Sequence, residues 1–374
     1  MPVASLAQAI PFFDYPATFQ TEEEDLLAIV RETGRRGAFI LQKDLARFER
    51  NLAEYLGSRH ALGVANATDG LLIALRAAGL GTGAEIIFSS HTMVATAAAI
   101  HFSGATPVPV ECAADHLIDP DAVEEAVTPR TRAILVSQLN GRTADMEKLG
   151  AIATRRELFV IEDAAQALGS KFRGRSAGTF GLAGAISFYP AKMLGCLGDG
   201  GAVTTNDDLI QERMVALHDH GRGSSGEIAG WGLNSRLDNV QAAILDYRLK
   251  KMDAMIQRRR HIAAIYRQYF KGLDELVLPP GPEDTTGHFD VYQNYEIEAD
   301  RRDALRDFLK IRGIGTILPW GGKAVHQWPS LGFRAKLPFT EALFDRLLLL
   351  PLNLSLTDDQ VTAVSTAIRE FYRA

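Results

Sequence analysis

The sequence Ser-Phe-Tyr-Pro-Ala-Lys-Met-Leu-Gly-Cys-Leu-Gly-Asp-Gly-Gly, residues 187–201, carries one lysine, Lys192, just before a run rich in glycine. An apolar run at residues 183–188 leads into it and Ala-Val-Thr-Thr at 202–205 follows, so we expect Lys192 on a loop between two buried strands. Glycines there let a flat ligand approach the backbone. Apolar surroundings lower the pKa of an ammonium group, which suits an amine that forms a Schiff base. A surface lysine on a glycine-rich turn is the alternative that this stretch alone leaves open.

The composition is that of an ordinary globular protein. The chain has 374 residues, of which 47% are hydrophobic and 23% charged, enough for one large and one smaller domain. The net charge of -6 and the mixed charge pattern favour neither nucleic acid nor an anionic membrane as a partner. Cys112 and Cys196 are too few for a disulfide framework and are not spaced for a metal site. Without a signal-peptide pattern or a membrane-length apolar run, we expect a cytoplasmic protein.

Short strand patterns alternate with helical patterns in the first part of the chain. The expected strands cover residues 60–64, 85–88, 107–110, 133–137 and 158–162. This alternation predicts an α/β fold with a mostly parallel sheet that is covered by helices on both faces. Ligands bind such sheets at the carboxyl ends of the strands. We therefore expect function in the segments that follow strands, at residues 66–70, 89–93, 138–142 and 163–166 and in the Lys192 loop.

Prolines and helix signals divide the rest of the chain. Residues 1–20 are rich in proline and aromatic residues and predict an extended arm. Thr21 and Glu24 have capping-box spacing and predict a helix start, and a second helix is expected over residues 44–56. The expected division is an N-terminal arm at 1–20, a large domain at 21–249 and a small C-terminal α+β domain at 250–374.

The expected C-terminal domain follows a long helical region at residues 237–271, which we expect to break near residue 250. A strand over 292–298 and a helix over 301–312 come next. Thr357 and Gln360 have the spacing of a capping box and predict the start of a final helix.

Two segments after strands could hold parts of an anionic aromatic ligand. Residues 66–70, Asn-Ala-Thr-Asp-Gly, open a helix expected over 71–78, where free N–H groups and the helix dipole favour an anion. A plain N-cap at Thr68 or Asp69 is the alternative. Asp163 ends an apolar strand, and a buried carboxylate needs a cation to stay ionised. That cation could be a protonated pyridine nitrogen, whereas without such a ligand Asp163 would be a helix cap or part of an ion pair.

A lysine for an imine, an acid for a pyridinium nitrogen and a helix N-terminus for a phosphate are what pyridoxal 5′-phosphate needs from a protein. The motifs narrow the choice further, and they are Glu-Asp-Ala-Ala-Gln-Ala at 162–167, Ser-Phe-Tyr-Pro-Ala-Lys at 187–192, Gly-Asp-Gly-Gly at 198–201 and Gly-Leu-Asn-Ser-Arg-Leu-Asp-Asn-Val-Gln-Ala-Ala at 232–243. Together they resemble the DegT/StrS-type nucleotide-sugar aminotransferases, which have the aspartate-aminotransferase-like fold (fold type I). The resemblance is strong over residues 37–249 and weaker in the C-terminal third.

The resemblance implies a role for each matching residue. Lys192 would form the Schiff base with the cofactor and move the proton, and Asp163 would pair with the pyridine nitrogen. Gln166 would sit beside the cofactor ring. The residues implied at the phosphate are Ala67, Thr68 and Ser187, joined by Asn234 from the other subunit of a homodimer with shared active sites.

The sequence departs from the family pattern at several of these positions. Ala67 stands where glycine is usual, and Met93 stands where an aromatic ring usually stacks on the cofactor, so a thioether would cover that face only partly. Whether His91 supplies a ring there is open. Leu168 replaces a common histidine, and Gln-Leu-Asn-Gly-Arg at 138–142 replaces the usual His-Leu-Tyr-Gly-Gln. We expect these last changes to bear on the substrate more than on the type of reaction.

The implied reaction is transfer of an amino group from L-glutamate to a nucleotide-linked keto-sugar. The Asn-Ser-Arg-Leu-Asp form at 234–238 looks more like members that act at C3 than like those that act at C4. Arg222, Arg236 and Lys323 are candidates for binding the substrate diphosphate.

Two other functions remain open beside the aminotransferase. A related sugar dehydratase is one, although such members typically carry histidine in place of Lys192. A non-catalytic regulatory protein that binds the cofactor is the other.

Overall fold

The computed structural model describes residues 9–223, 225–284 and 286–373. Its largest element is a seven-stranded sheet in the order β1-β9-β8-β5-β4-β2-β3. The strands are β1 (His60–Val64), β2 (Glu85–Ser89), β3 (Thr106–Val110), β4 (Thr131–Ser137), β5 (Phe159–Asp163), β8 (Ala183–Ser187) and β9 (Gly201–Thr205). All neighbouring pairs are parallel except those that β9 makes with β1 and β8. The mostly parallel α/β sheet expected from the sequence is therefore confirmed.

Helices cover both faces of this sheet because neighbouring strand residues point to opposite sides. Ile86 and Phe88 of β2 belong to one apolar cluster, which they share with α4 (Ala67–Ala77), α5 (Val94–Ser103) and α8 (Asp208–His218). Ile87, between them, belongs to another cluster on the opposite face. The helices on that face are α3 (Lys43–Leu56), α6 (Pro120–Ala126), α7 (Met146–Arg156) and α9 (Asn239–Leu249).

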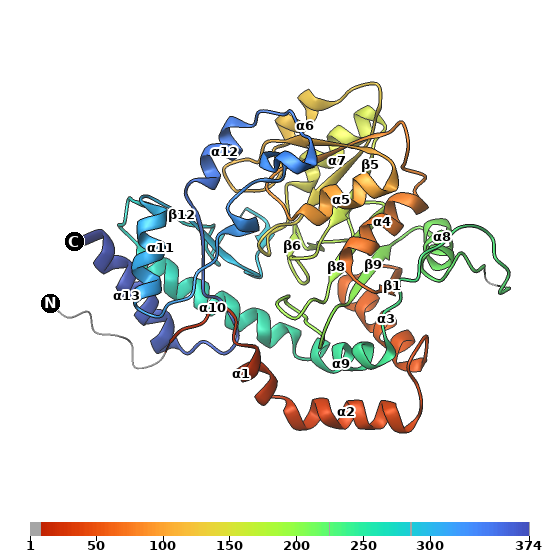
Figure 1. Cartoon of the computed structure of the whole chain (residues 1–374), viewed down its shortest axis with the longest axis horizontal. Coiled ribbons are helices and arrows are strands. Elements are labelled where there is room, and N and C mark those ends of the chain that lie inside the picture. The colour runs from red at the N-terminus through yellow and green to blue at the C-terminus, as the bar shows by residue number, and fades with distance from the viewer. Residues whose placement is uncertain (1–8, 224, 285, 374) are drawn as a thin grey trace.

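A smaller antiparallel sheet forms the C-terminal part. It has the order β10-β12-β13, with β10 (Leu276–Val277), β12 (Tyr295–Ala299) and β13 (Leu347–Leu350). It shares an apolar core with α10 (Met252–Phe270), α11 (Arg302–Ile311) and α13 (Asp358–Arg373). Figure 1 shows α10 running from this part toward α9 beneath the larger sheet. The expected smaller α+β part is confirmed, whereas the domain limits at residues 20 and 249 stay predictions.

The remaining elements lie outside these two sheets. They are α1 (Tyr15–Gln20), α2 (Glu23–Arg35), β6 (Lys171–Phe172), β7 (Arg175–Ser176), β11 (His288–Phe289), α12 (Pro338–Phe344) and three 3₁₀ turns at Pro319–Gly321, Val325–Gln327 and Pro329–Leu331. Within the described ranges, no helix combines the length and the apolar character that crossing a bilayer requires.

The main helices and strands lie within a few residues of their expected positions, but three local expectations were wrong. The N-terminal arm is not extended throughout, because Asp14 caps the short helix α1; residues 1–8 of the arm lie outside the described residues. Thr21 does not cap α2, since its hydroxyl donates back to the carbonyl of Thr18.

Helix α4 starts four residues earlier than expected, at Ala67, and Asn66 caps it rather than Thr68 or Asp69. At the other end, the capping box of Thr357 and Gln360 before α13 is confirmed.

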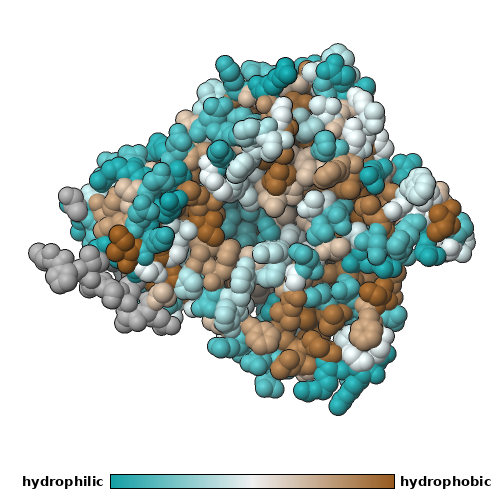
Figure 2. Space-filling view, viewed as in Figure 1, coloured by the Kyte–Doolittle hydropathy of each residue, from teal (hydrophilic) through white to brown (hydrophobic). Residues whose placement is uncertain are grey.

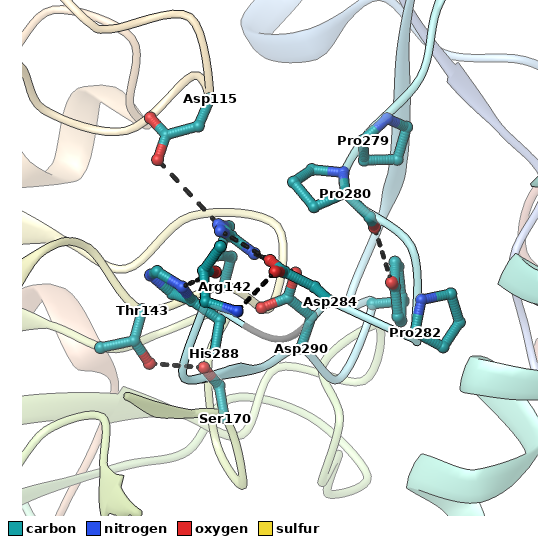
Figure 3. A network of polar contacts seen from close by, with 12 residues as sticks. Asp115, Arg142, Thr143, Ser170, Pro279, Pro280, Pro282, Asp284, His288 and Asp290 are labelled. Carbon is teal, nitrogen blue, oxygen red and sulfur yellow. Dashed lines mark hydrogen bonds and ion pairs between the residues drawn. The ribbon is translucent and has the colours of Figure 1, made fainter. Parts of the chain in front are cut away.

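A partly buried arginine, Arg142, joins the loop after β4 to the segment that precedes β12. Arg142 Nη1 lies 2.7 Å from Asp290 Oδ2 and 3.2 Å from Asp284 Oδ2, and Figure 3 shows these two carboxylates on one side of the guanidinium and Asp115 on another. A buried charge without such partners would be strongly destabilising, so these residues hold one another in place. The two parts of the chain are thus fastened together close to the carboxyl end of β4.

A second, partly buried link involves His116, which follows β3, and two carboxylates of β12. His116 Nδ1 lies 2.8 Å from Glu296 Oε1, and Nε2 lies 3.3 Å from Glu298 Oε1. Burial by itself lowers the pKa of His116, but the hydrogen bonds and charges of Glu296 and Glu298 outweigh it and raise the pKa to about 9. The imidazole is therefore protonated at neutral pH and contributes an ionic tie between the two sheets.

This tie predicts a pH-dependent stability. Because the folded-state pKa of His116 is raised, its contribution is fully present below pH 6.5 and is lost as the pH rises through about 9. His116→Asn removes the charge, and asparagine tolerates the left-handed backbone found there, with φ of 67°. The free energy of unfolding of the wild type should exceed that of H116N by up to about 3 kcal/mol at pH 6. Denaturant titrations at pH 6 and pH 9.5 measure this gap, and a gap that does not shrink with pH would contradict the account.

Candidate active site

The loop between β8 and β9 holds Lys192 at the carboxyl edge of the larger sheet. The Lys192 N–H donates to the Tyr189 carbonyl at 2.8 Å, and Gln293 Nε2 donates to the Ala191 carbonyl at 2.7 Å. Gly195 is required by the tight path, since a Cβ there would lie 2.6 Å from the Pro190 carbonyl oxygen. Burial lowers the pKa of Lys192 to about 8, although the charge of Asp163 acts in the opposite direction. A substantial neutral fraction of this amine is thus present near physiological pH.

Asp163 ends β5, where it is paired with Ser137 at the end of β4 and with Ala185 in β8. Its Oδ2 accepts a hydrogen bond from Thr96 Oγ1 at 2.7 Å, and its Oδ1 accepts one from the Ala165 N–H at 3.2 Å. Burial raises the pKa of this carboxyl group, and the Thr96 and Ala165 hydrogen bonds and the charge of Lys192 offset that only in part. Asp163 and Lys192 therefore lie close enough for their charges to interact. A further cation beside Asp163 would stabilise its ionised form.

The start of α4 lies at the same edge. Gly201, the first residue of β9, is paired with Val64 on one side and Ser187 on the other. A Cβ on Gly201 would lie 2.7 Å from the Ala67 nitrogen, so only glycine lets β9 approach the helix start this closely. Ala67 and Thr68 occupy the first turn of α4, where backbone N–H groups lack helical partners. Ala67, Thr68 and Ser187 are therefore gathered around one helix N-terminus.

Gln166 is held from the side of the smaller sheet. Its Oε1 accepts the Asn140 N–H at 2.9 Å, and Asn140 Nδ2 donates to Glu296 Oε1 at 2.9 Å. Asn294 Nδ2 donates in turn to Asn140 Oδ1 at 2.8 Å. Asn140, which replaces the family's usual tyrosine, thus connects Gln166 to β12.

Met93 and His91 lie in different surroundings. Met93 caps α5, is 47% exposed and lines a cavity of about 370 Å³, while its sulfur accepts the Ala95 N–H at 3.2 Å. His91 is buried, with its ring centroid 5.0 Å from that of Phe344 and its Nε2 3.5 Å from Glu296 Oε1. The imidazole therefore packs in the contact with the C-terminal part and is not among the residues that line the Met93 cavity.

Asn234 is exposed and lies in the segment between α8 and α9. Its backbone pairs with that of Asp219, just after α8, and the hydroxyl of the next residue, Ser235, accepts the Ala65 N–H at 3.2 Å. The Asn234 segment thus runs past the strand end that precedes α4 in the same chain, and the Asn234 side chain faces outward.

The other departures from the family pattern occupy internal positions. Leu168 is 3% exposed in the apolar core beneath α3 and α9. Gln138 bonds Glu162 through its Nε2 at 2.8 Å and accepts the Ala144 N–H at 2.7 Å. Arg142 is paired with Asp290 and Asp284 through its Nη atoms, while its Nε has no hydrogen-bond partner among the described residues. Leu168 and Gln138 therefore serve the fold, and Arg142 joins two segments of the chain.

The three basic candidates for a diphosphate differ in their partners. Arg236 Nη1 lies 2.9 Å from Asp219 Oδ1, and Arg222 Nε lies 3.9 Å from the other oxygen of the same carboxylate. Lys323 instead has its ammonium 5.2 Å from the centre of the Trp328 ring. Of these three residues, the two arginines have a carboxylate within 4.0 Å in the described part of the chain, and Lys323 does not.

Sequence reasoning missed several residues that support the site. Thr96 reaches Asp163 from α5, and Thr92 links Thr96 to Ser137 by hydrogen bonds of 3.0 and 2.7 Å. Gln293, which holds the Lys192 loop, comes from a segment a hundred residues further along the chain. None belongs to a motif with fixed spacing, so the sequence gives no signal for them. No cluster of three or more potential metal ligands occurs in the part of the chain that the structure covers.

Comparison with known proteins places this geometry in a family. The model of the DegT/DnrJ/EryC1/StrS aminotransferase family matches residues 20–369. The dTDP-3-amino-3,4,6-trideoxy-alpha-D-glucose transaminase of Streptomyces venezuelae is 40% identical over 97% of this chain and 96% of its own length. A pleiotropic regulatory protein of Geobacillus stearothermophilus is 38% identical over 97% of this chain and 99% of its own.

A solved structure agrees with these relatives. The crystal structure of S. venezuelae DesV in complex with a ketimine intermediate has a TM-score of 0.94 and 38% identity, and it covers 98% of this chain and 100% of that one. The resemblance seen in the motifs and the fold type expected from it are confirmed. The chain belongs to the DegT/DnrJ/EryC1/StrS aminotransferase family.

Proposed function

We propose that this aminotransferase uses pyridoxal 5′-phosphate to move an amino group from L-glutamate to a nucleotide-linked 3-keto sugar. The observation that carries the proposal is the meeting of Lys192 and Asp163 at one sheet edge, with opposite pKa shifts that burial causes. Pairs of titratable groups whose surroundings shift their pKa values in this way are typical of acid and base sites.

Three features of the structure fit the cofactor. Lys192 offers an amine of lowered pKa, Asp163 is a buried carboxylate that would gain from a cation, and the first turn of α4 offers a phosphate backbone N–H groups that lack helical partners. The residues proposed to hold the group are Lys192 at its aldehyde carbon, Asp163 at its pyridine nitrogen, Gln166 and Met93 beside its ring, and Ala67, Thr68, Ser187 and the partner's Asn234 at its phosphate. When bound, the cofactor supplies a carbonyl for the amino group and a ring that accepts electrons.

The chain's own groups would then perform the proton transfers. Lys192 Nζ would take a proton from the carbon that bears the amino group of the donor, and its lowered pKa leaves enough neutral amine to do so. Asp163, fixed by Thr96, would keep a proton on the ring nitrogen by offering it a negative charge. Burial of both groups would strengthen this electrostatic effect by excluding water.

Two observations support the proposed acceptor. The S. venezuelae relative is named for a sugar that carries its amino group at C3, attached to dTDP. The Asn-Ser-Arg-Leu-Asp segment at 234–238 resembles family members that act at C3. Action at C4 is the alternative within the same chemistry.

Exposed apolar groups support the proposed homodimer. Trp231 is 98% exposed and Ile228 is 62% exposed, close to Asn234 in the chain. Phe39 and Leu197, both exposed, lie against α9, to which each is hydrogen-bonded, and Figure 2 shows apolar residues gathered over this region in the lower part of the molecule. Exposed apolar patches of this kind commonly mark interfaces.

A regulatory, non-catalytic function is the second candidate. The name of the G. stearothermophilus relative is the observation that favours it. Lys192 and Asp163 argue for catalysis, because a protein that only binds the cofactor would not need an amine of lowered pKa beside an acid.

The first prediction concerns Lys192. Purified wild-type protein should show the visible absorption of a lysine-bound cofactor, and L-glutamate should abolish that band. Lys192→Ala should lack the band and lose turnover by roughly 10²–10⁴-fold or more, because the proton-transfer group is gone. Lys148→Ala, an exposed lysine on α7, serves as the control and should behave as the wild type. A K192A protein that keeps both band and turnover would refute the proposed chemistry.

The second prediction concerns the acceptor. Wild-type protein converted to its amino form with L-glutamate should regain the visible band when a nucleotide-linked 3-keto sugar is added. The corresponding 4-keto sugar should restore the band much more slowly. If the 4-keto sugar reacts faster, the assignment to C3 is wrong while the aminotransferase chemistry stands.

The third prediction concerns the shared active site. Lys192→Ala and Asn234→Ala chains should each form dimers with low activity at limiting cofactor. Dimers reassembled from an equal mixture should recover roughly a quarter of wild-type activity, because half are mixed and each of these has one intact site. Size-exclusion chromatography confirms that mixed dimers form. Mixed dimers that show no recovery would contradict a contribution of Asn234 across the interface.

A further inference from the structure

Three hydroxyl groups lie in a row behind Asp163. Thr96 Oγ1, on α5, is 2.7 Å from Asp163 Oδ2. Thr92 Oγ1, in the turn before α5, is 3.0 Å from Thr96 Oγ1 and 2.7 Å from Ser137 Oγ. Ser137 ends β4, and its backbone is paired with that of Asp163 in β5. Because Thr92, Thr96 and Ser137 are all buried, the row is shielded from solvent.

The direction of the hydrogen bonds in this row follows from the number of protons. A hydroxyl group has one proton to donate, and an ionised carboxylate only accepts. Thr96 therefore gives its proton to Asp163, so the bond between Thr96 and Thr92 must be donated by Thr92. Thr92 then has no proton left for Ser137, and Ser137 donates to Thr92. All three O–H groups thus point toward the carboxylate as long as Asp163 is ionised.

Hydroxyl groups aligned in this way stabilise the ionised form of Asp163. Hydrogen bonds in a chain polarise one another, and each is electrostatically stronger where water is excluded. Burial raises the pKa of Asp163, and the Thr96 hydrogen bond opposes this rise more strongly than the Ala165 N–H or the charge of Lys192 does. Thr96 is thus the main support of this carboxylate within the described chain.

This support does not depend on the charge of Lys192. Burial lowers the pKa of Lys192 to about 8, so its charge changes near physiological pH, and the proposed proton transfers would change it again. The hydroxyl groups of threonine and serine do not titrate in this range. The row therefore keeps its effect on Asp163 whichever form the lysine takes.

The positions of the hydroxyl oxygens are fixed by the fold. Ser137 lies on an interior strand of the larger sheet. The Thr96 N–H donates to the Met93 carbonyl at 3.1 Å in the first turn of α5. Threonine side chains also have few χ1 rotamers, because they branch at Cβ. A carboxylate that accepts a hydrogen bond from such a fixed donor is itself held in one orientation.

We propose that Thr96, Thr92 and Ser137 are positioning residues that keep Asp163 ionised and aimed at the ring nitrogen of the cofactor. The inference rests on the proposed function, because that nitrogen is the group that Asp163 is proposed to meet. It goes beyond that function, since it makes the preference of the site for a protonated ring nitrogen depend on hydroxyl groups that act through Asp163.

The test compares pyridoxal 5′-phosphate with its deaza analogue, in which a C–H group replaces the ring nitrogen. Full-length wild type and variants are titrated with each compound, and the dissociation constants are measured by absorbance and fluorescence. The wild type should bind pyridoxal 5′-phosphate more tightly than the analogue. Thr96→Val keeps the shape of the side chain but removes the donor, so it should reduce this preference by about 10-fold or more. Thr96→Ser retains a hydroxyl group and should keep most of the preference.

The other two residues of the row provide a second, graded test. Thr92→Val leaves Thr96 in place but removes the bond that polarises it, so it should reduce the preference by about 2-fold or more, and by less than Thr96→Val. Ser137→Ala should have an effect no larger than that of Thr92→Val. Thr154→Val is the control, since Thr154 is an exposed threonine of α7, and it should match the wild type. Unfolding midpoints show which variants are folded, and Thr92→Val carries the test if Thr96→Val does not fold.

A Thr96→Val protein that binds both compounds more weakly by the same factor has lost only structure, and that result would overturn the proposal. So would a preference in Thr96→Val or Thr92→Val equal to that of the wild type, or a wild type without any preference. The aminotransferase chemistry would still stand in these cases if the wild type reacts with L-glutamate. A reduced preference in Thr96→Val, in a protein whose wild type does not react with L-glutamate, would instead support the positioning role and count against the proposed function.

Discussion

A buried carboxylate at the carboxyl end of a parallel strand needs hydrogen bonds or a cation to stay ionised, and the candidate active site depends on how this chain supplies them to two neighbouring carboxylates. Glu162 and Asp163 point to opposite faces of the sheet because they are adjacent in β5. Glu162 accepts hydrogen bonds from the N–H groups of Gly178, Phe180 and Gly181 and from Gln138. Asp163 accepts only those of Thr96 and Ala165 within the described chain, with Lys192 nearby. The first acid is thus satisfied by the fold, whereas the second keeps capacity for a ligand.

The smaller sheet serves the same site although it contributes none of the acidic or basic groups proposed for catalysis. Gln293 holds the Lys192 loop, and Glu296 holds Asn140, which in turn holds Gln166. His116 and Arg142 fasten the loops after β3 and β4 to the same C-terminal region. These polar contacts hold the loops on the side away from the larger sheet. They thereby preorganise the groups proposed to face the cofactor.

The sequence predicted the sheet, the position of Lys192 between two strands and the position of Asp163 at a strand end, because these follow from local apolar patterns. It misplaced the start of α4, since Asn66, Thr68 and Asp69 are all good capping residues and only the folded backbone decides among them. It also linked the departures at Leu168, Gln138 and Arg142 to the identity of the substrate. In the structure Leu168 and Gln138 are buried, and Arg142 is paired with Asp290 and Asp284. Contacts such as Thr96 with Asp163 join residues far apart in the chain, and no local pattern reveals them.

The central claim is that the amine of Lys192 is the group that binds the cofactor covalently. The most direct measurement is to reduce the purified, cofactor-loaded protein with borohydride, digest it and locate the modified residue by mass spectrometry. The account predicts that the added pyridoxyl phosphate mass is found on the peptide that contains Lys192 and is attached to that lysine. Its attachment to another lysine, or its absence from a protein that still catalyses the reaction, would contradict the account.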